Sequence, residues 1–252
     1  MRGPSRRLFV GALVLGFIGA LVVTGPAWAQ SLSLDLGGAS STRTLLQLFA
    51  LTTVLALGPS IAVTVTSFTR IIVVLSLVRS ALGLQQTPPN IVLTSLAVFM
   101  SIFIMGPTWE RALKDGVTPY MEGRMAEGEA IKAATEPFRQ FMLRNVRESE
   151  LQLMVDIARK SDPQLQIPSG EMPWRVLVPA FMLSELRIAF EMGFIIFLPF
   201  MVIDIVVSSV LMAMGMMMVP PSLIALPIKL IFFVFVDGWA LLAGSLLQSY
   251  RI

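Results

Sequence analysis

The stretch Leu211-Met212-Ala213-Met214-Gly215-Met216-Met217-Met218-Val219-Pro220-Pro221 separates two long apolar runs near the end of the chain. Gly215 and the Pro220-Pro221 pair interrupt a helix, because proline cannot donate the helical hydrogen bond and glycine favours turns. Each flanking run, about 192–212 and 222–247, is long enough to cross a bilayer, which takes about 20 apolar residues. The sequence therefore predicts a helical hairpin whose turn is made of methionine.

Methionine in such a turn has two explanations. The side chain is a common gap-filler in protein cores, and this chain contains 16 methionines, so ordinary packing explains the run on composition alone. Alternatively, the turn faces a passage, where a deformable apolar surface must fit many different shapes. Composition does not decide between the two.

The overall composition indicates an integral membrane protein. The 252 residues are 55% hydrophobic and only 14% charged, with a mean hydropathy of +0.78, which is too apolar for a soluble domain. The sequence contains no cysteine and no histidine, which excludes thiolate nucleophiles, imidazole bases, disulfides and zinc sites built on nitrogen or sulfur. We therefore expect no catalytic, cofactor-binding or metal-binding residue, and no enzyme.

The beginning of the chain has the pattern of a secretory signal peptide. Three arginines in the first seven residues precede an apolar run and the small-x-small site Ala27-Trp28-Ala29. The pattern predicts a signal peptide at 1–29, cleaved between Ala29 and Gln30, with an uncleaved anchor helix as the alternative. These arginines account for the whole formal charge of +3, so the remainder is neutral, which argues against a nucleic-acid partner.

After a short polar lead at 30–44, which we expect to be mobile, the chain divides into three helical segments. Residues 45–107 hold two apolar runs, and a connecting loop that contains Arg70 and Arg79 and no acidic residue predicts a hairpin with its loop in the cytoplasm. Residues 108–175 carry balanced charges, which predicts a helical domain outside the cytoplasm, and 176–252 form the C-terminal hairpin with the methionine loop at 212–221. The predicted fold is an all-α membrane protein of about four long apolar helices plus the extracytoplasmic helical segment.

Local signals mark helix ends in the middle segment. Thr118-Pro119 predicts a helix start, and Ser149 with Gln152 fits a capping box. Asp162-Pro163 predicts the end of that second helix. Four apolar residues at i, i+3, i+4 and i+7 predict one buried face on it. These are Leu151, Met154, Val155 and Ala158.

Six charged residues lie inside the C-terminal apolar runs. A lone charge at bilayer depth costs about 2.5–3.5 kcal/mol, so each residue needs a partner or water. Arg187 and Glu191 are four residues apart and can pair along one helix. Lys229 has no acidic residue within one turn, so it must reach another helix or another subunit, and Glu185 or Glu191 is the expected partner. The six are Glu185, Arg187, Glu191, Asp204, Lys229 and Asp237.

Three explanations fit these charges. They lie in interfacial or aqueous regions, they relay protons or ions as in secondary transporters, or they form salt bridges that fix a ring of subunits around a conduit. An aspartyl protease built on Asp204 and Asp237 lacks any local motif that would bring the two carboxyl groups together.

Several long motifs resemble the FliP family of flagellar type III export-gate subunits. The first two are PAFMLSELRIAFEMGF at 179–194 and TSFTRIIVVLSLVR at 66–79, the latter followed by QQTPPN at 85–90. The tail is similar to the same family, from PFMVID at 199–204 through the methionine loop to PIK and VDGW. The resemblance covers most of residues 45–247.

The resemblance implies a pore-forming subunit of the flagellar protein export gate, in the bacterial cytoplasmic (inner) membrane within the basal body. Such a subunit passes unfolded flagellar proteins, and it assembles with copies of itself, with FliQ and FliR and with other export-apparatus membrane proteins into a multi-subunit helical bundle. The family's methionine-rich loop seals the closed pore as a gasket, at Met216, Met217 and Met218 in this sequence. An ion-coupled secondary transporter or ion channel that uses the buried charges remains the alternative function.

Overall fold

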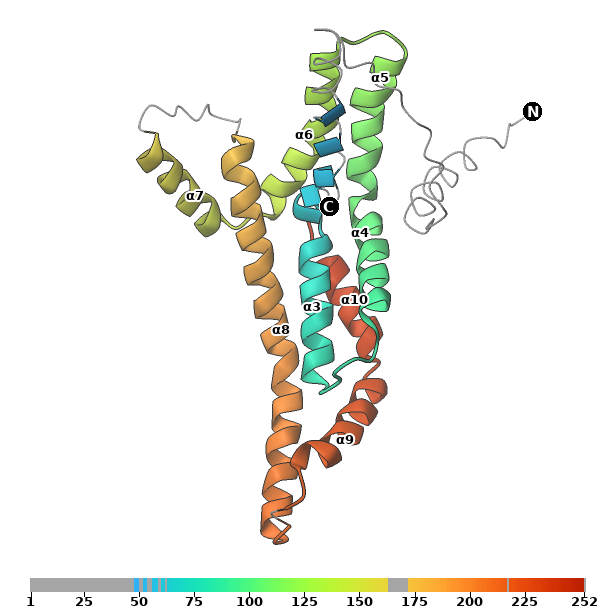
Figure 1. Cartoon of the computed structure of the whole chain (residues 1–252), viewed down its shortest axis with the longest axis vertical. Helices are drawn as coiled ribbons and strands as arrows, with labels where there is room; N and C mark the ends of the chain where they lie inside the picture. Colours follow the sequence, from blue (N-terminus) through green and yellow to red (C-terminus); the bar gives the residue numbers. More distant parts are fainter. Residues whose placement is uncertain are drawn as a thin grey trace, which may run out of the picture. The chain divides into compact units, whose positions relative to one another are not determined.

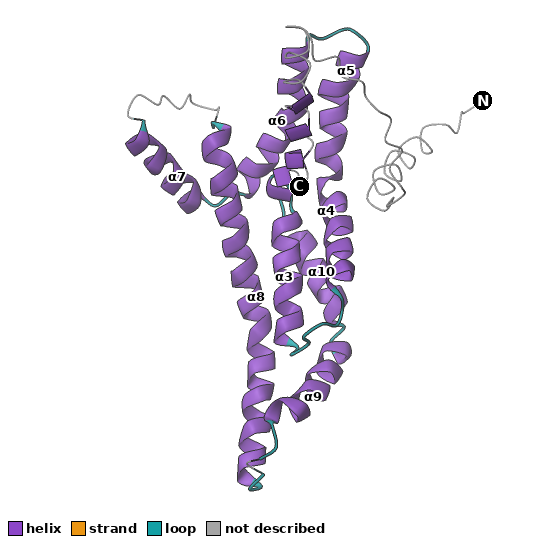
Figure 2. Ribbon diagram, in the orientation of Figure 1, coloured by secondary structure: helices purple, strands orange, loops and turns teal. Residues whose placement is uncertain are grey.

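The chain divides into two compact units, Met1–Thr53 and Val54–Ile252, and every helix named below belongs to the second. The regular structure of the described residues is entirely helical, with no strand among them (Figure 2). The predicted all-α class is therefore confirmed. The computed structural model describes residues 48–49, 52–53, 56–58, 60–61, 63–162, 172–216 and 218–251.

Helix α3 (Phe68–Ala81) lies at the centre of the second unit, between α8 (Trp174–Ala213) and α4 (Asn90–Ala112) (Figure 1). Its apolar residues recur every three or four positions, so one continuous face of the helix is removed from solvent. This face belongs to the main hydrophobic core. Its most deeply buried members are Ile71, Val74, Leu75 and Val78.

Helix α4 does not end where the middle segment was expected to begin. It continues through one π-helical turn, η1 (Leu113–Val117), into α5 (Thr118–Met121), so that Asn90–Met121 is one helical stretch of 32 residues. The predicted helix start at Thr118-Pro119 is wrong. A π turn shifts the hydrogen-bond register just before the proline, so the missing N–H of Pro119 is tolerated without a break.

Helix α6 (Glu127–Asn145) returns beside α4 and η1 (Figure 1). The two backbones come close at Gly116, where an added Cβ would lie 2.5 Å from the amide nitrogen of Ala134. Trp109 packs edge-on against Phe138, with 4.8 Å between the ring centroids. These contacts make the middle segment part of the same compact unit as α3 and α8.

Helix α7 (Glu148–Ser161) packs on α8 and ends at Asp162, as predicted. The predicted capping box is wrong, because the helix begins after Arg147 and the Ser149 hydroxyl donates to the Glu150 carboxylate rather than to the backbone. Glutamates in the first turn stabilise the start through the helix dipole instead. The predicted apolar face is confirmed, since its four residues are half-buried while the positions between them, and those that follow in the helix, are exposed. They are Leu151, Met154, Val155 and Ala158.

The C-terminal hairpin begins with α8, a single helix of 40 residues that ends at the methionine turn (Figure 1). The expected single helix after the turn is two helices, α9 (Pro221–Phe235) and α10 (Gly238–Gln248), bent by 63°. The bend arises at Asp237, whose φ of 52° is left-handed and cannot continue a right-handed helix.

Two helices of the described residues are long and apolar enough to cross a membrane, Asn90–Met121 and Trp174–Ala213, and the bent pair α9–α10 makes a third if it counts as one span. Helix α3, with 14 residues, is shorter than the roughly 20 that a span requires. The first apolar run of 45–107 is described only in part. The chain is an all-α membrane protein, and the count of four spans stays a prediction.

Candidate functional site

The methionine turn closes the end of α8 with backbone hydrogen bonds alone. The Gly215 N–H donates to the carbonyl of Met212 at 3.1 Å, and the Met216 N–H donates to that of Leu211 at 2.9 Å. This pair of bonds is the Schellman motif, which requires a left-handed residue, and Gly215 supplies it with a φ of 73°. Because no side chain is needed to cap the helix, the turn can consist of apolar residues.

The described methionine side chains of this turn are exposed. Met212, Met214 and Met216 are 63%, 67% and 41% exposed, and Met218 is 98% exposed. Met217 lies outside the described residues. Large apolar side chains gathered at an exposed tip mark a surface for lipid, protein or ligand. Within the second unit, core packing therefore does not explain these four methionines.

The two arms of the hairpin are held together close to the tip by a small cluster. Val207 and Leu211 of α8 and Ala225 of α9 are its buried members. Further from the tip, the Lys229 ammonium donates to Asp204 of α8 at 2.6 Å and to the carbonyl of Ala81 at 3.1 Å. A cation at the C-terminal end of α3 also interacts favourably with that helix dipole.

The partner of Lys229 is thus Asp204, and the expectation of Glu185 or Glu191 is wrong. Asp204 lies 12 residues before Met216 and Lys229 lies 13 residues after it. In an antiparallel hairpin, residues at equal distances from the turn lie side by side. The position of the turn in the sequence therefore contained the information needed to find this pair.

Glu185 is engaged in the core instead. Its carboxylate is fully buried and forms a two-point ion pair with Arg70 of α3, with Arg70 Nε 3.1 Å from Oε2. The Tyr250 hydroxyl lies 2.6 Å from the same carboxylate and 3.1 Å from the carbonyl of Ser67. Burial, and then the charge of Glu185, raises the pKa of Tyr250 well above its ordinary value, so the hydroxyl keeps its proton.

Arg70 joins the end of the chain to this ion pair. Its guanidinium donates to the hydroxyl and carbonyl of Ser249 at 2.9 and 3.1 Å, and lies 3.9 Å from the centroid of the Tyr250 ring. The sequence predicts Arg70 in a cytoplasmic loop, whereas the structure buries it in α3. Its partners lie 115 to 180 positions away in the sequence, where no local pattern points to them.

A second group of charges fastens the start of α7 to α8. Arg147 contacts both oxygens of Glu191 at 2.8 Å, and Arg187 lies 2.7 Å from Glu150 and 3.2 Å from Glu191. The predicted pair of Arg187 with Glu191 is confirmed. A hydrogen bond from Ser149, and then the Arg187 guanidinium, holds the pKa of Glu150 below its ordinary value against the opposing effect of burial.

Comparison with known proteins fixes the family. The FliP family model matches residues 51–246, which is most of the chain. The chain belongs to the FliP family. It is 50% identical over 240 residues to the flagellar biosynthetic protein FliP of Caulobacter vibrioides, covering 94% of this chain and 89% of that relative. The proteins of the same name from Rhizobium meliloti and Bacillus subtilis are 44% and 46% identical over 237 and 204 residues, covering 92% and 81% of this chain and 96% and 91% of theirs.

In this FliP-family chain the six predicted charges do not form one site. Glu185 lies in the core, Arg187 and Glu191 of α8 pair with residues at the start of α7, and Asp204 pairs with Lys229. Asp237 is exposed at the α9–α10 bend and forms no ion pair with any residue that the structure describes, whereas Asp204 pairs with Lys229. The predicted cleavage residues Ala29 and Gln30 lie outside the described residues.

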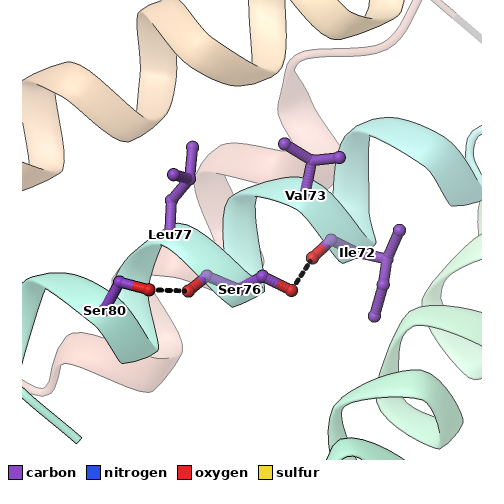
Figure 3. Close-up of a pocket in the computed structure, with 5 residues that line it drawn as sticks. All are labelled: Ile72, Val73, Ser76, Leu77 and Ser80. Atoms are coloured by element: carbon purple, nitrogen blue, oxygen red, sulfur yellow. Dashed lines mark hydrogen bonds between the residues drawn. The ribbon is translucent and has the colours of Figure 1, made fainter. Parts of the chain in front are cut away.

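Helix α3 also carries a shallow apolar groove of about 300 Å³ on its outer side (Figure 3). Ser76 and Ser80 lie in it, but their hydroxyls donate to the carbonyls of Ile72 and Ser76 at 2.7 and 3.0 Å. Both hydroxyls are thus satisfied by the helix itself. The FliP-family chain therefore presents hydrocarbon rather than free polar groups in this groove.

Proposed function

We propose that this chain is a pore-forming subunit of the flagellar type III protein export gate, and that it passes unfolded flagellar proteins across the cytoplasmic membrane. Membership of the FliP family, whose relatives are named flagellar biosynthetic proteins, supports a role in flagellar biosynthesis. Helices long enough to span a bilayer support a membrane-embedded component. We place it in the inner membrane within the basal body, as a structural subunit and not an enzyme.

The exposed methionine turn is the observation that carries this proposal. A passage for unfolded chains cannot use a rigid polar filter, because the cargo presents every kind of side chain in turn. It needs an apolar constriction that excludes ions and deforms around a polypeptide, and flexible thioethers meet both demands. Met216, Met217 and Met218 act in this proposal as the gasket of the closed pore.

Several copies of the turn are needed to close a pore, so the subunit acts in an oligomer. We propose that its partners are other copies of itself, FliQ, FliR and other membrane proteins of the export apparatus, with unfolded flagellar proteins as substrates. Large apolar side chains on the outer faces of α4, α8 and α9 support extensive contacts with lipid or neighbouring helices. Examples are Phe99, Phe103, Phe194, Ile205 and Phe235.

Replacement of Met216, Met217 and Met218 by alanine tests the gasket directly. Alanine shortens all three side chains, so the assembled resting complex should conduct ions while its assembly stays intact. The measurement is single-channel conductance of the purified complex in planar bilayers. Met121→Ala is the matched control, because Met121 is 80% exposed but lies in α5, away from the turn.

Leucine at the same three positions separates apolarity from flexibility. Leucine keeps the seal apolar but has fewer rotatable bonds, so we expect a closed resting pore and slower export. An alanine variant that conducts no more than the Met121→Ala control refutes the gasket role.

The transporter alternative predicts ion flux through the isolated chain. A relay needs neighbouring titratable groups, whereas the charges of α8 and α9 lie in separate groups, each with its own partner. Flux measured in liposomes that contain only this protein would favour a transporter. The export gate would be favoured if the isolated protein carries no ions, and conductance appears only in the assembled complex whose Met216, Met217 and Met218 are replaced by alanine.

A further inference from the structure

The junction between α9 and α10 is a defined bend. Asp237 holds it with a left-handed backbone, and Gly238 is buried directly against the Phe233 ring, so that an added Cβ would lie 2.2 Å from a ring carbon. The two helices meet at 63° across only Val236 and Asp237. Such short connections between rigid helices are where hinge motions concentrate.

Helix α10 is fixed on the far side of this bend. Leu242 and Leu246 are buried in the main core. Beyond the helix, Arg70 donates to Ser249. The Asn145 side chain accepts from the Arg251 N–H at 3.0 Å and donates to its carbonyl at 3.4 Å. The end of the chain is therefore tied by polar contacts to α3 and α6.

Helix α9 is attached far more lightly. Only Ala225, Lys229 and Phe233 are buried, and they form a single stripe at i, i+4 and i+8. The polar contacts that this stripe makes with other described helices are those of Lys229 with Asp204 and Ala81. A hollow of about 350 Å³ lies beside the stripe, and Lys229, Asp204 and Ala81 are among the residues that line it. Besides the apolar contacts of Ala225 and Phe233 with α8, the helix thus has one polar latch, with free space next to it.

We infer that α9 is an arm that pivots at residues 236–238 against the fixed α10, and that the contacts of Lys229 with Asp204 and Ala81 latch it in the closed position. Fifteen residues make a helix about 22 Å long, so a rotation of about 15° moves its far end by about 6 Å. That end carries the methionine turn. The assignment of this motion to opening of the pore rests on the proposed function, whereas the motion itself does not.

Distances between paired spin labels test the arm. The chain has no native cysteine, so labels can be attached at chosen positions without a background. Leu223→Cys with Leu241→Cys reports α9 against α10, and Phe103→Cys with Leu241→Cys reports α10 against α4. All three positions are exposed, by 70%, 60% and 70% in the order Leu223, Leu241 and Phe103. The measurement uses the full chain in its purified assembly.

Lys229→Met removes the latch while keeping an apolar chain of similar length. We expect the mean distance of the α9–α10 pair to shift by about 5 Å or its distribution to broaden by that amount, while the α10–α4 pair stays unchanged. Asp204→Asn is the second variant, because it weakens the ion pair and keeps the contact with Ala81. It should give a smaller shift in the same pair.

Two results would overturn the inference. If the α9–α10 distance is unchanged in both variants, α9 and α10 move as one body. If both label pairs change together, α10 is not a fixed anchor. Neither result affects the conductance test on the methionines, so a rigid arm and a failed gasket are distinguishable outcomes.

Discussion

The two halves of α8 are held in opposite ways. Eight of its eleven buried residues lie between Val176 and Gly193, where α3, α6 and α7 surround the helix. Between Phe194 and Ala213, by contrast, only Phe200, Val207 and Leu211 are buried. One helix therefore begins inside a packed core and ends as one side of a sparsely covered hairpin.

This difference shows how one chain can combine a fixed scaffold with a deformable tip. In the first half, buried polar groups have specific partners, and every change of position would leave a charge unsatisfied. In the second half, a few apolar contacts and one ion pair, whose Asp204 carboxylate is half-exposed, hold the hairpin, so fewer contacts fix its position. The buried polar contacts, rather than the helical backbone, therefore decide which half of α8 is held in place.

The largest effect is expected where the scaffold is most specific. Glu185→Ala removes the partner of the buried Arg70 and should lower the free energy of unfolding by about 3–5 kcal/mol. Thermal unfolding of the detergent-solubilised protein measures this loss. Glu191→Ala is the matched control on the same helix, because Glu191 is half-exposed and solvent screens its ion pairs, so its loss should be much smaller than that of Glu185→Ala.

A double replacement sharpens the result. Arg70→Met with Glu185→Met removes both charges and fills the space with hydrocarbon, so most of the lost stability should return. Equal losses for Glu185→Ala and Glu191→Ala would contradict the division of α8 into a specific and a tolerant half.

A smaller loss is expected from Tyr250→Phe. This change keeps the ring against Arg70 and removes only the hydroxyl that lies 2.6 Å from Glu185. A hydrogen bond to a buried charge contributes about 1.5–3 kcal/mol, so chemical denaturation should show a loss in that range. Tyr120→Phe is the control, since the only other tyrosine is half-exposed in α5. A loss of equal size in both variants would place Tyr250 outside the charge cluster.

The sequence predicted those features that depend on neighbours along the chain. The length of the apolar runs predicted α8 and the hairpin around the methionine turn, and apolar periodicity predicted the buried face of α7. Four-residue spacing predicted the pair of Arg187 with Glu191. The pair of Asp204 with Lys229 could have been predicted, because the two residues lie at nearly equal distances along the sequence from the turn. The contacts of Arg70 were not, since they depend on how distant helices pack.

Hydropathy also missed the bend after α9. A run of apolar residues scores equally whether one straight helix or two bent helices contain it, and the signal was the dipeptide Asp237-Gly238 inside that run. Aspartate and glycine are both among the residues that adopt left-handed backbone most readily. Backbone conformation, not apolarity, decided the geometry at this point.

The smallest effect belongs to the tip itself. Gly215→Ala meets no neighbouring atom within 4 Å, so its whole cost is the left-handed φ of 73°, which should lower stability by about 1 kcal/mol. Gly128→Ala, also without neighbours but inside α6, should raise stability by about 0.5–1 kcal/mol, because alanine favours a right-handed helix. The denaturant midpoints of the two variants measure these two opposite changes in stability. If both changes stabilise the protein, the turn does not depend on its left-handed glycine.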